Sequence, residues 1–159
     1  MTVPTERAAV LALGSNLGHR RDILQGGVDA IAGLSEVRLI AVSPVYETVP
    51  VGGPPQPDYL NAVVLAGTTL PPRELLGRLH EVEAAFDRVR VVRWGPRTLD
   101  IDIITVSGER SDDPALTLPH PRAHERAFVL APWHDIEPGA EIPGRGKIGR
   151  ASCRERVWR

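Results

Sequence analysis

The chain has 159 residues, of which 42% are hydrophobic and 25% charged, a composition typical of one globular domain rather than a disordered chain. Its formal net charge of −1 excludes recruitment of a polyanion or an anionic membrane by bulk electrostatics, so neither nucleic acid nor a membrane is expected as a partner. No apolar run reaches the length of a transmembrane helix, and the N-terminus lacks the pattern of a signal peptide, which together predict a cytoplasmic protein.

Lysine and cysteine are almost absent, and both absences restrict the chemistry that the chain can perform. Lys147 is the only lysine, so phosphate binding in the main body must use arginine, histidine, backbone N–H groups or a metal. Cys153 is the only cysteine, and without it the domain can form no disulfide, thiolate zinc site or cysteine nucleophile. Both lie in an arginine-rich end without apolar periodicity. We therefore expect a domain over residues 1–144 and a disordered or non-native tail over 145–159.

The first half of the chain predicts a strand, a helix and a second strand. A short apolar run over 8–13 ends at a glycine and indicates a buried strand. A stripe of apolar residues at helical spacing predicts a helix from about 20 to 34. The segment 37–48 alternates loosely between apolar and polar residues, which favours a strand. A long loop over 49–58 follows, with four prolines and two glycines.

The second half predicts a strand, a helix, a strand and a last helix. Residues 59–66 form an apolar run, and two prolines then open a helix that extends to about residue 86. An arginine-rich loop over 87–97 precedes an alternating strand from 98 to 103. After a polar turn, the pattern predicts a short strand at 116–118 and a helix over 128–136.

This order of elements, βαββαβ, is the split pattern of a ferredoxin-like α+β sandwich. Such a fold has a mostly antiparallel sheet, with helices on one face and an open face on the other. In the strand from 98 to 103, Leu99, Ile101 and Ile103 share one face, while Asp100 and Asp102 share the other. We therefore expect the carboxylates on the open face, with mobile loops around them. The fold alone does not identify a function, because many functions use it.

The aspartate pair has two interpretations. An Asp-x-Asp pattern on an alternating strand is most often a solvated sheet face. Carboxylates two residues apart on one face repel each other, however, unless cations lie between them. Two oxygen ligands on a rigid strand suit Mg²⁺, which binds one or two protein carboxylates together with substrate phosphates. The residues around the pair decide between the two interpretations.

Arginines directly upstream favour the metal interpretation. Four of them fall within ten residues, either as a solvated loop or as guanidinium groups that grip phosphate oxygens; they are Arg88, Arg90, Arg93 and Arg97. His80 and Glu83 share one face of the preceding helix, which is either solvated or part of the same site.

Other polar and aromatic residues are also ambiguous. Asn61 interrupts an apolar strand, and a buried amide there must find partners, which a ligand with donor and acceptor groups could supply. His120 is either a histidine of a surface turn or, with Arg126 close by in the sequence, a phosphate contact. Trp94 and Tyr46 are equally consistent with packing in the core and with stacking on a planar ligand.

Several of these stretches together closely resemble one family. The matching stretches run in order over roughly residues 8 to 144 and are LALGSNLG, SPVYET, QPDYLNA, RWGPRTLDIDI, LPHPRAHERAFVLAPW and IEPG. They resemble the 6-hydroxymethyl-7,8-dihydropterin pyrophosphokinase family of folate biosynthesis, and RWGPRTLDIDI is the most specific of them. The resemblance implies a ferredoxin-like fold, ATP as co-substrate, two Mg²⁺ ions and transfer of pyrophosphate from ATP to the pterin hydroxymethyl group, releasing AMP. The reduced hydroxymethylpterin would be the other small-molecule substrate, and a monomer is expected.

The resemblance also implies roles for individual residues. Asp100 and Asp102 would hold both metal ions and, with Arg88 and Arg97, form the catalytic set. The ATP-binding residues would be His80, Glu83, Arg88, Arg90, Arg97, His120 and Arg126. The pterin-binding residues would be Thr48, Tyr59, Asn61, Trp94 and Phe128.

The sequence departs from the family pattern in the catalytic loop. Asp87 stands where the family often has glycine, and Val91-Val92 replace a basic residue in a loop that is one residue shorter. A competing interpretation is a non-catalytic ferredoxin-like module that binds RNA or a small regulatory ligand. An RNA-binding sheet would carry aromatics on its open face, whereas this one carries carboxylates and the whole chain is only 4% aromatic.

Overall fold

The computed structural model describes residues 5–16, 18–49, 57–87 and 99–150. Its centre is a five-stranded antiparallel sheet in the order β2-β4-β1-β5, with the short β3 also paired to β4. This arrangement confirms the predicted βαββαβ sandwich. The strands are β1 (Arg7–Ser15), β2 (Val37–Val42), β3 (Tyr46–Thr48), β4 (Tyr59–Thr68) and β5 (Asp100–Val106).

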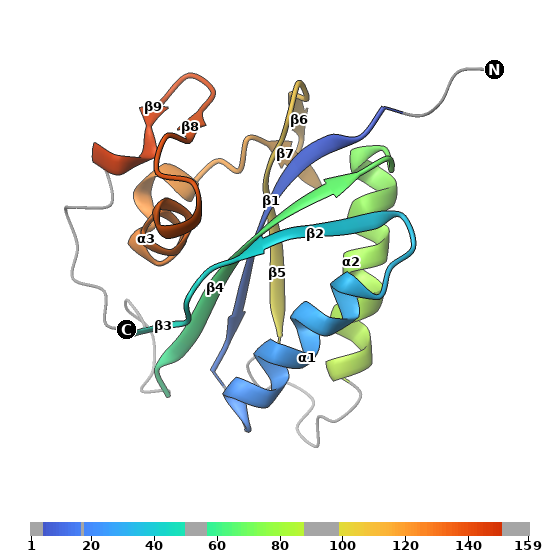
Figure 1. The fold of residues 1–159 in the computed structure, drawn as a ribbon, viewed down its shortest axis with the longest axis vertical. Helices are drawn as coiled ribbons and strands as arrows, with labels where there is room; N and C mark the ends of the chain where they lie inside the picture. Colours follow the sequence, from blue (N-terminus) through green and yellow to red (C-terminus); the bar gives the residue numbers. More distant parts are fainter. Residues whose placement is uncertain (1–4, 17, 50–56, 88–98, 151–159) are drawn as a thin grey trace.

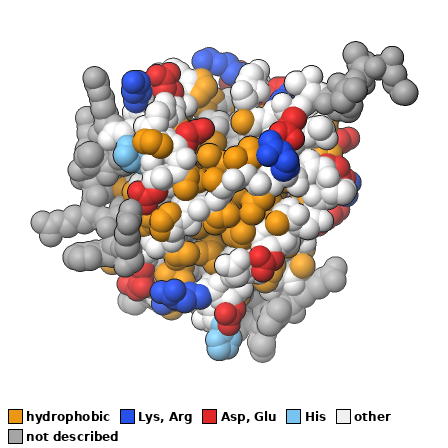
Figure 2. Space-filling view, in the orientation of Figure 1, with side chains coloured by type: hydrophobic (Ala, Val, Ile, Leu, Met, Phe, Trp, Pro, Cys, Tyr) orange, Lys and Arg blue, Asp and Glu red, His pale blue; other side chains and the backbone are white. Residues whose placement is uncertain are grey.

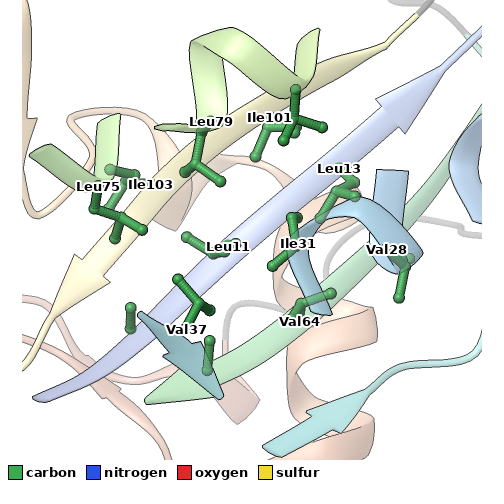
Figure 3. Close-up of a cluster of buried hydrophobic side chains, with 14 of the residues drawn as sticks. Leu11, Leu13, Val28, Ile31, Val37, Val64, Leu75, Leu79, Ile101 and Ile103 are labelled. Atoms are coloured by element: carbon green, nitrogen blue, oxygen red, sulfur yellow. The ribbon is translucent and has the colours of Figure 1, made fainter. Parts of the chain in front are cut away.

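Two helices cover one side of the sheet, as Figure 1 shows. They are α1 (Arg20–Ala32) and α2 (Pro72–Asp87), and both bury an apolar stripe at helical spacing. Figure 3 shows Val28 and Ile31 of α1, and Leu75 and Leu79 of α2, directed at apolar side chains of the strands such as Leu11. No helix in the described part of the chain is long and apolar enough to cross a membrane.

The other side of the sheet is partly covered, where the sequence predicts an open face. Helix α3 (Ala127–Ile136) packs there and buries Trp133, which is 1% exposed, against Val10, Val63 and Ile104 (Figure 1). The helix is apolar around most of its circumference, so it needs a sheet face to bury it. It covers only one end of this face. Asp102, at the other end, is exposed and Asp100 is half-buried.

The long second strand of the prediction is two strands in the structure. The break lies at Ser43 and Pro44, between β2 and β3. Proline has no N–H group to continue the ladder, and the Ser43 hydroxyl accepts the N–H of Val63 at 2.8 Å instead. The predicted polar turn after β5 also differs, because it contains β6 (Ser111–Asp113), which pairs with β7 (Leu116–Leu118). A strand of three polar residues has no apolar alternation that could reveal it.

The described fold extends past residue 144, where the sequence predicts that the domain ends. β8 (Glu141–Ile142) pairs with β9 (Gly146–Lys147), and the short 3-10 helices are η1 (Ala123–Glu125) and η2 (Ile148–Arg150). Ile148 is 1% exposed, and its N–H donates to the Ala140 carbonyl at 3.0 Å. Residues 151–159, with Cys153, lie outside the described residues.

Truncation after Gly144 is expected to weaken the fold without removing activity. The loss of Ile148 from the core beside α3 should cost about 1.5–3 kcal/mol of unfolding free energy. Thermal melting and a turnover assay would measure the two effects, and a chain ending at Arg150 is the matched control. A truncated protein that melts normally but is inactive would contradict this expectation.

Candidate active site

One row of residues crosses four strands on the sheet face that α3 partly covers. The register pairs Tyr46 with Asn61, Asn61 with Gly14, and Gly14 with Asp100. Directly opposed residues of neighbouring strands share one face. Asn61 and Asp100 are therefore two strand spacings apart, on the order of 10 Å, with only a glycine between them. The row thus presents an amide and a carboxylate on one sheet face, separated by a residue without a side chain.

Gly14 allows Asn61 and Tyr59 to approach the middle of this row closely. A Cβ atom at this position would lie 3.2 Å from Asn61 Oδ1 and 3.9 Å from Cδ1 of Tyr59. A side chain would therefore press on the amide and fill the space beside it. The register pairs Gly14, the first glycine of the GSNLG stretch, with Asn61 and Asp100.

The amide end of the row brings three predicted residues together. Asn61 is buried, and its Nδ2 donates to Thr48 Oγ1 at 2.7 Å, which supplies a partner for the amide. Thr48 is paired in turn with Tyr59 across the strands. Burial raises the pKa of the Tyr59 phenol, and the negative charge of Asp100 raises it further. Tyr59 is therefore a neutral aromatic ring beside the carboxylate.

Tyr46 has a structural role that the sequence left open. Its side chain is buried, and its hydroxyl donates to the carboxylate of Asp135 on α3. This bond joins the strand that carries Thr48 to the helix that covers the rest of the face. Tyr46 therefore packs in the protein and holds one wall of the row in position.

The carboxylate end of the row contacts a cation. Arg126 Nη1 lies 3.9 Å from Asp102 Oδ2, and the Arg126 guanidinium carbon lies 5.5 Å from the centre of the Phe128 ring. A cation over an aromatic face is a favourable arrangement. Arg126 thus contacts both Phe128 and Asp102. The family resemblance gives these three residues different roles: Arg126 would bind ATP, Phe128 the pterin and Asp102 the metal.

His120 is held beside the same carboxylates by a bulge in β5. The register of β1 and β5 shifts between Val10 and Leu11, which leaves Ile104 unpaired, and the Ile104 carbonyl accepts the His120 N–H at 2.8 Å. Nδ1 of His120 accepts the Arg122 N–H at 3.2 Å, so a neutral ring carries its proton on Nε2.

The electrostatic surroundings favour that neutral ring. Burial lowers the pKa of His120 most, the charge of Asp102 opposes this, and the positive charges of Arg126 and Arg122 lower the pKa further. With its pKa below the ordinary value of 6.5, the imidazole is neutral at pH 7. His120 can therefore offer an N–H donor from Nε2.

A pocket of about 260 Å³ lies between α2 and the segment that leads to His120. It brings the His80 and Glu83 pair to Asp102 and His120, which lie far from that pair in the sequence or on another element. His80 is exposed, whereas Glu83 is only 6% exposed and Glu83 Oε2 accepts the backbone N–H of Ile101 at 3.0 Å. The two residues therefore do not form one solvated face. The sequence analysis missed the opposite wall, for which it held no signal: Pro114, Ala115, Leu116 and Thr117.

The protein side chains at this site would supply only part of the coordination shell of a metal ion. Among the described residues, no group of three or more His, Cys, Asp and Glu side chains could hold a metal ion. Asp100 and Asp102 alone offer oxygen ligands on one strand face. Mg²⁺ fits such a pair, because it commonly takes one or two carboxylates and completes its shell with water and phosphate oxygens.

A larger cavity, of about 490 Å³, lies away from the carboxylates and contains none of the predicted site residues. Ile40 and Trp133 are among the residues that line it. Figure 2 shows hydrophobic side chains gathered in the middle of the viewed face, and Ile40 and Val42 of β2 are 49% and 41% exposed.

Some predicted residues lie outside the described residues, so their roles stay predictions. They belong to the segment between α2 and β5 and are Arg88, Arg90, Arg93, Trp94 and Arg97.

Comparison with known proteins identifies the family. The family model for 7,8-dihydro-6-hydroxymethylpterin-pyrophosphokinase (HPPK) matches residues 10–138. Similar curated proteins, each named 2-amino-4-hydroxy-6-hydroxymethyldihydropteridine pyrophosphokinase, include one from Pseudomonas aeruginosa, 44% identical over 133 residues, which are 84% of this chain and 82% of that protein. Others are from Mycobacterium tuberculosis, 46% identical over 147 residues (86% and 76%), and Bacillus subtilis, 44% identical over 128 residues (80% and 77%).

Solved structures agree in fold. A Plasmodium falciparum HPPK-DHPS crystal structure with pterin and p-hydroxybenzoate has a TM-score of 0.74 at 15% identity. The match covers 97% of this chain but only 44% of that longer chain. At this identity the structural likeness shows the fold alone, whereas the family model and the bacterial relatives show the family. The chain belongs to the 7,8-dihydro-6-hydroxymethylpterin-pyrophosphokinase family.

Proposed function

We propose that this protein transfers pyrophosphate from ATP to the hydroxymethyl group of 6-hydroxymethyl-7,8-dihydropterin, giving the pterin diphosphate and AMP, in folate biosynthesis. The observation that carries the proposal is the row in which Gly14 separates the Asn61 amide from the Asp100 carboxylate. The amide end of the row would recognise a polar heterocycle, and the carboxylate end would bind a metal ion. The two ends lie within the length of one small molecule. The names of relatives up to 46% identical agree with it.

The pterin would lie at the amide end of the row. Asn61 and Thr48 offer hydrogen-bonding groups to its polar edge, and they are already joined to each other at 2.7 Å. Tyr59 and Phe128 supply aromatic surface, and Trp94 would add to it from the segment before β5. A buried polar pair aimed at a heterocycle gives specificity, because a ligand without matching groups would leave the pair unsatisfied.

ATP would occupy the pocket beside α2 and the carboxylate end of the row. His120 can donate from Nε2 to a phosphate oxygen, and Arg126 adds positive charge there. Arg88, Arg90 and Arg97 would supply further phosphate contacts, and His80 lies at the exposed edge of the pocket. Most of the catalysis then consists of positioning and charge neutralisation, as phosphoryl transfer generally requires.

Asp100 and Asp102 would hold the metal, and we propose two Mg²⁺ ions. When bound, Mg²⁺ neutralises phosphate charge and lowers the pKa of a coordinated hydroxyl group. The hydroxymethyl oxygen then forms a bond to the β-phosphorus of ATP. The bond from that phosphorus to the oxygen bridging the α- and β-phosphates breaks, AMP leaves, and the hydroxyl proton passes to solvent. The chain's task is to align the two reactants for this displacement.

The formation of AMP tests this proposal directly. The protein is incubated with ATP, Mg²⁺ and the reduced hydroxymethylpterin, and AMP and pterin diphosphate are quantified by chromatography. We expect equal amounts of both products, and no AMP when the pterin or Mg²⁺ is omitted. AMP formed at the same rate without pterin, or no AMP under any condition, would refute the proposal and favour the non-catalytic ligand-binding module. A monomeric state and a cytoplasmic location stay predictions from the sequence.

A further inference from the structure

The strand that carries the two aspartates lies at the edge of the sheet. The order β2-β4-β1-β5 places β5 outermost, so only β1 pairs with it among the described strands. N–H groups along a strand point alternately to its two edges. The N–H of Ile101, between Asp100 and Asp102, points away from β1 and has no strand to receive it in the described part of the sheet.

Glu83 takes the place of the missing strand at this one position. It projects from α2, is 6% exposed, and accepts the Ile101 N–H on Oε2 at 3.0 Å. Ile101 lies between Asp100 and Asp102, so α2 is bonded through Glu83 to the backbone between the two aspartates. Burying a carboxyl group is costly unless it is hydrogen-bonded. The bond from the Ile101 N–H therefore offsets part of the cost of burying Glu83.

The position of the bond matters because β5 is irregular immediately afterwards. The pairing with β1 is regular from Asp100 to Ile103 and shifts at the bulge at Ile104. An edge strand that bulges can move its side chains to new directions. The Glu83 bond lies in the regular stretch, where both carboxylates must keep one face and one spacing. It thus holds the backbone between the two carboxylates.

We infer that Glu83 is a positioning residue, which acts through the Ile101 backbone to hold Asp100 and Asp102 in the arrangement that binds Mg²⁺. The inference rests on the proposed function for the role of the metal, but the bond itself is a property of the free protein. It differs from a role for Glu83 as a direct ATP ligand. A positioning residue needs only a hydrogen-bond acceptor, which glutamine keeps, whereas alanine removes it.

Amide hydrogen exchange of the free protein tests the first half of the inference. In Glu83→Ala, the Ile101 amide should exchange at least about tenfold faster than in the wild type, because a buried hydrogen bond is lost. In Glu83→Gln it should stay within about threefold, since the glutamine oxygen still accepts the bond. The Leu11 amide in β1 serves as the internal reference. Equal acceleration at Leu11 would indicate general destabilisation and would overturn the inference.

Metal binding tests the second half, with Mn²⁺ as the probe. Binding of Mn²⁺ to the protein with a non-hydrolysable ATP analogue is measured by electron paramagnetic resonance. Glu83→Ala should weaken Mn²⁺ binding about tenfold or more, and Glu83→Gln should recover most of this loss. Glu81→Gln on the same helix, with a side chain 71% exposed, is the matched control and should leave Mn²⁺ binding unchanged.

The outcomes separate the inference from the proposed function. If Glu83→Gln binds Mn²⁺ as weakly as Glu83→Ala while Ile101 stays protected, the charge of Glu83 matters rather than its hydrogen bond, and the positioning role is wrong. If the variants behave as expected but the wild type forms no AMP, the positioning role stands and the proposed reaction fails.

Discussion

Replacing Asp102 with asparagine is expected to lower kcat at least about a hundredfold, because asparagine keeps the shape of the side chain but cannot neutralise a metal ion. Stability should hardly change. Asp102 is exposed, its contact with Arg126 at 3.9 Å is long, and its removal relieves repulsion from Asp100. We expect the free energy of unfolding to change by less than about 1 kcal/mol. Asp100→Asn should behave in the same way.

The measurement pairs AMP formation with a denaturant unfolding curve for each variant. Asp112→Asn is the matched control, since Asp112 is an exposed aspartate on β6, outside the row and the pocket. It should turn over as the wild type does. Normal turnover of both Asp100→Asn and Asp102→Asn would exclude the metal site, and unfolding of these variants would assign the aspartates a structural role instead.

Replacing Gly14 with valine is expected to remove pterin binding while the sheet survives. Valine suits a strand better than glycine does, so the backbone should keep its pairing. Its side chain, however, would fill the row between Asn61 and Asp100, and even a Cβ atom would lie only 3.2 Å from Asn61 Oδ1. A displacement of about 1 Å at a reacting centre can cost about a hundredfold, and we expect a loss of that size in kcat/KM for the pterin.

Equilibrium binding of the pterin in the absence of phosphoryl transfer would measure this effect directly. Ala8→Val is the matched control, because Ala8 lies on the same strand, β1, but lines the large cavity that contains none of the predicted site residues. It makes a similar change in size and should leave pterin binding intact. If Gly14→Val binds the pterin as the wild type does, the row between Asn61 and Asp100 is not the pterin site.

Local patterns account for the parts of this protein that the sequence predicts well. The period of two in β5 places Asp100 and Asp102 on one face, and the apolar stripes of α1 and α2 predict both helices and the side of the sheet that they cover. The amide of Asn61 could be expected to need a partner, and Thr48 is that partner. The periodicity of β5, α1 and α2 lies within a few neighbouring residues, whereas the pairing of Asn61 with Thr48 comes from the register of β3 and β4.

Other features could not be predicted because they depend on contacts between distant segments. α3 covers one end of the face that was expected to be open, since an apolar helix packs wherever the completed sheet offers an apolar surface. The three polar residues of β6 carry no strand pattern, and only their pairing with β7 makes them a strand. The burial of Ile148 in the core beside α3 depends likewise on a contact with a distant part of the chain.

The sequence by itself determined the family, the βαββαβ order of the main elements and the shared face of the carboxylate pair, because motifs and periodicity are properties of short stretches. Only the tertiary structure decided how these parts combine. The row from Asn61 through Gly14 to Asp100 follows from the register of strands that lie far apart in the sequence. The bond from Ile101 to Glu83 requires a helix to lie against a particular edge strand. Register and packing arise from the burial of the whole core, which no single stretch of sequence contains.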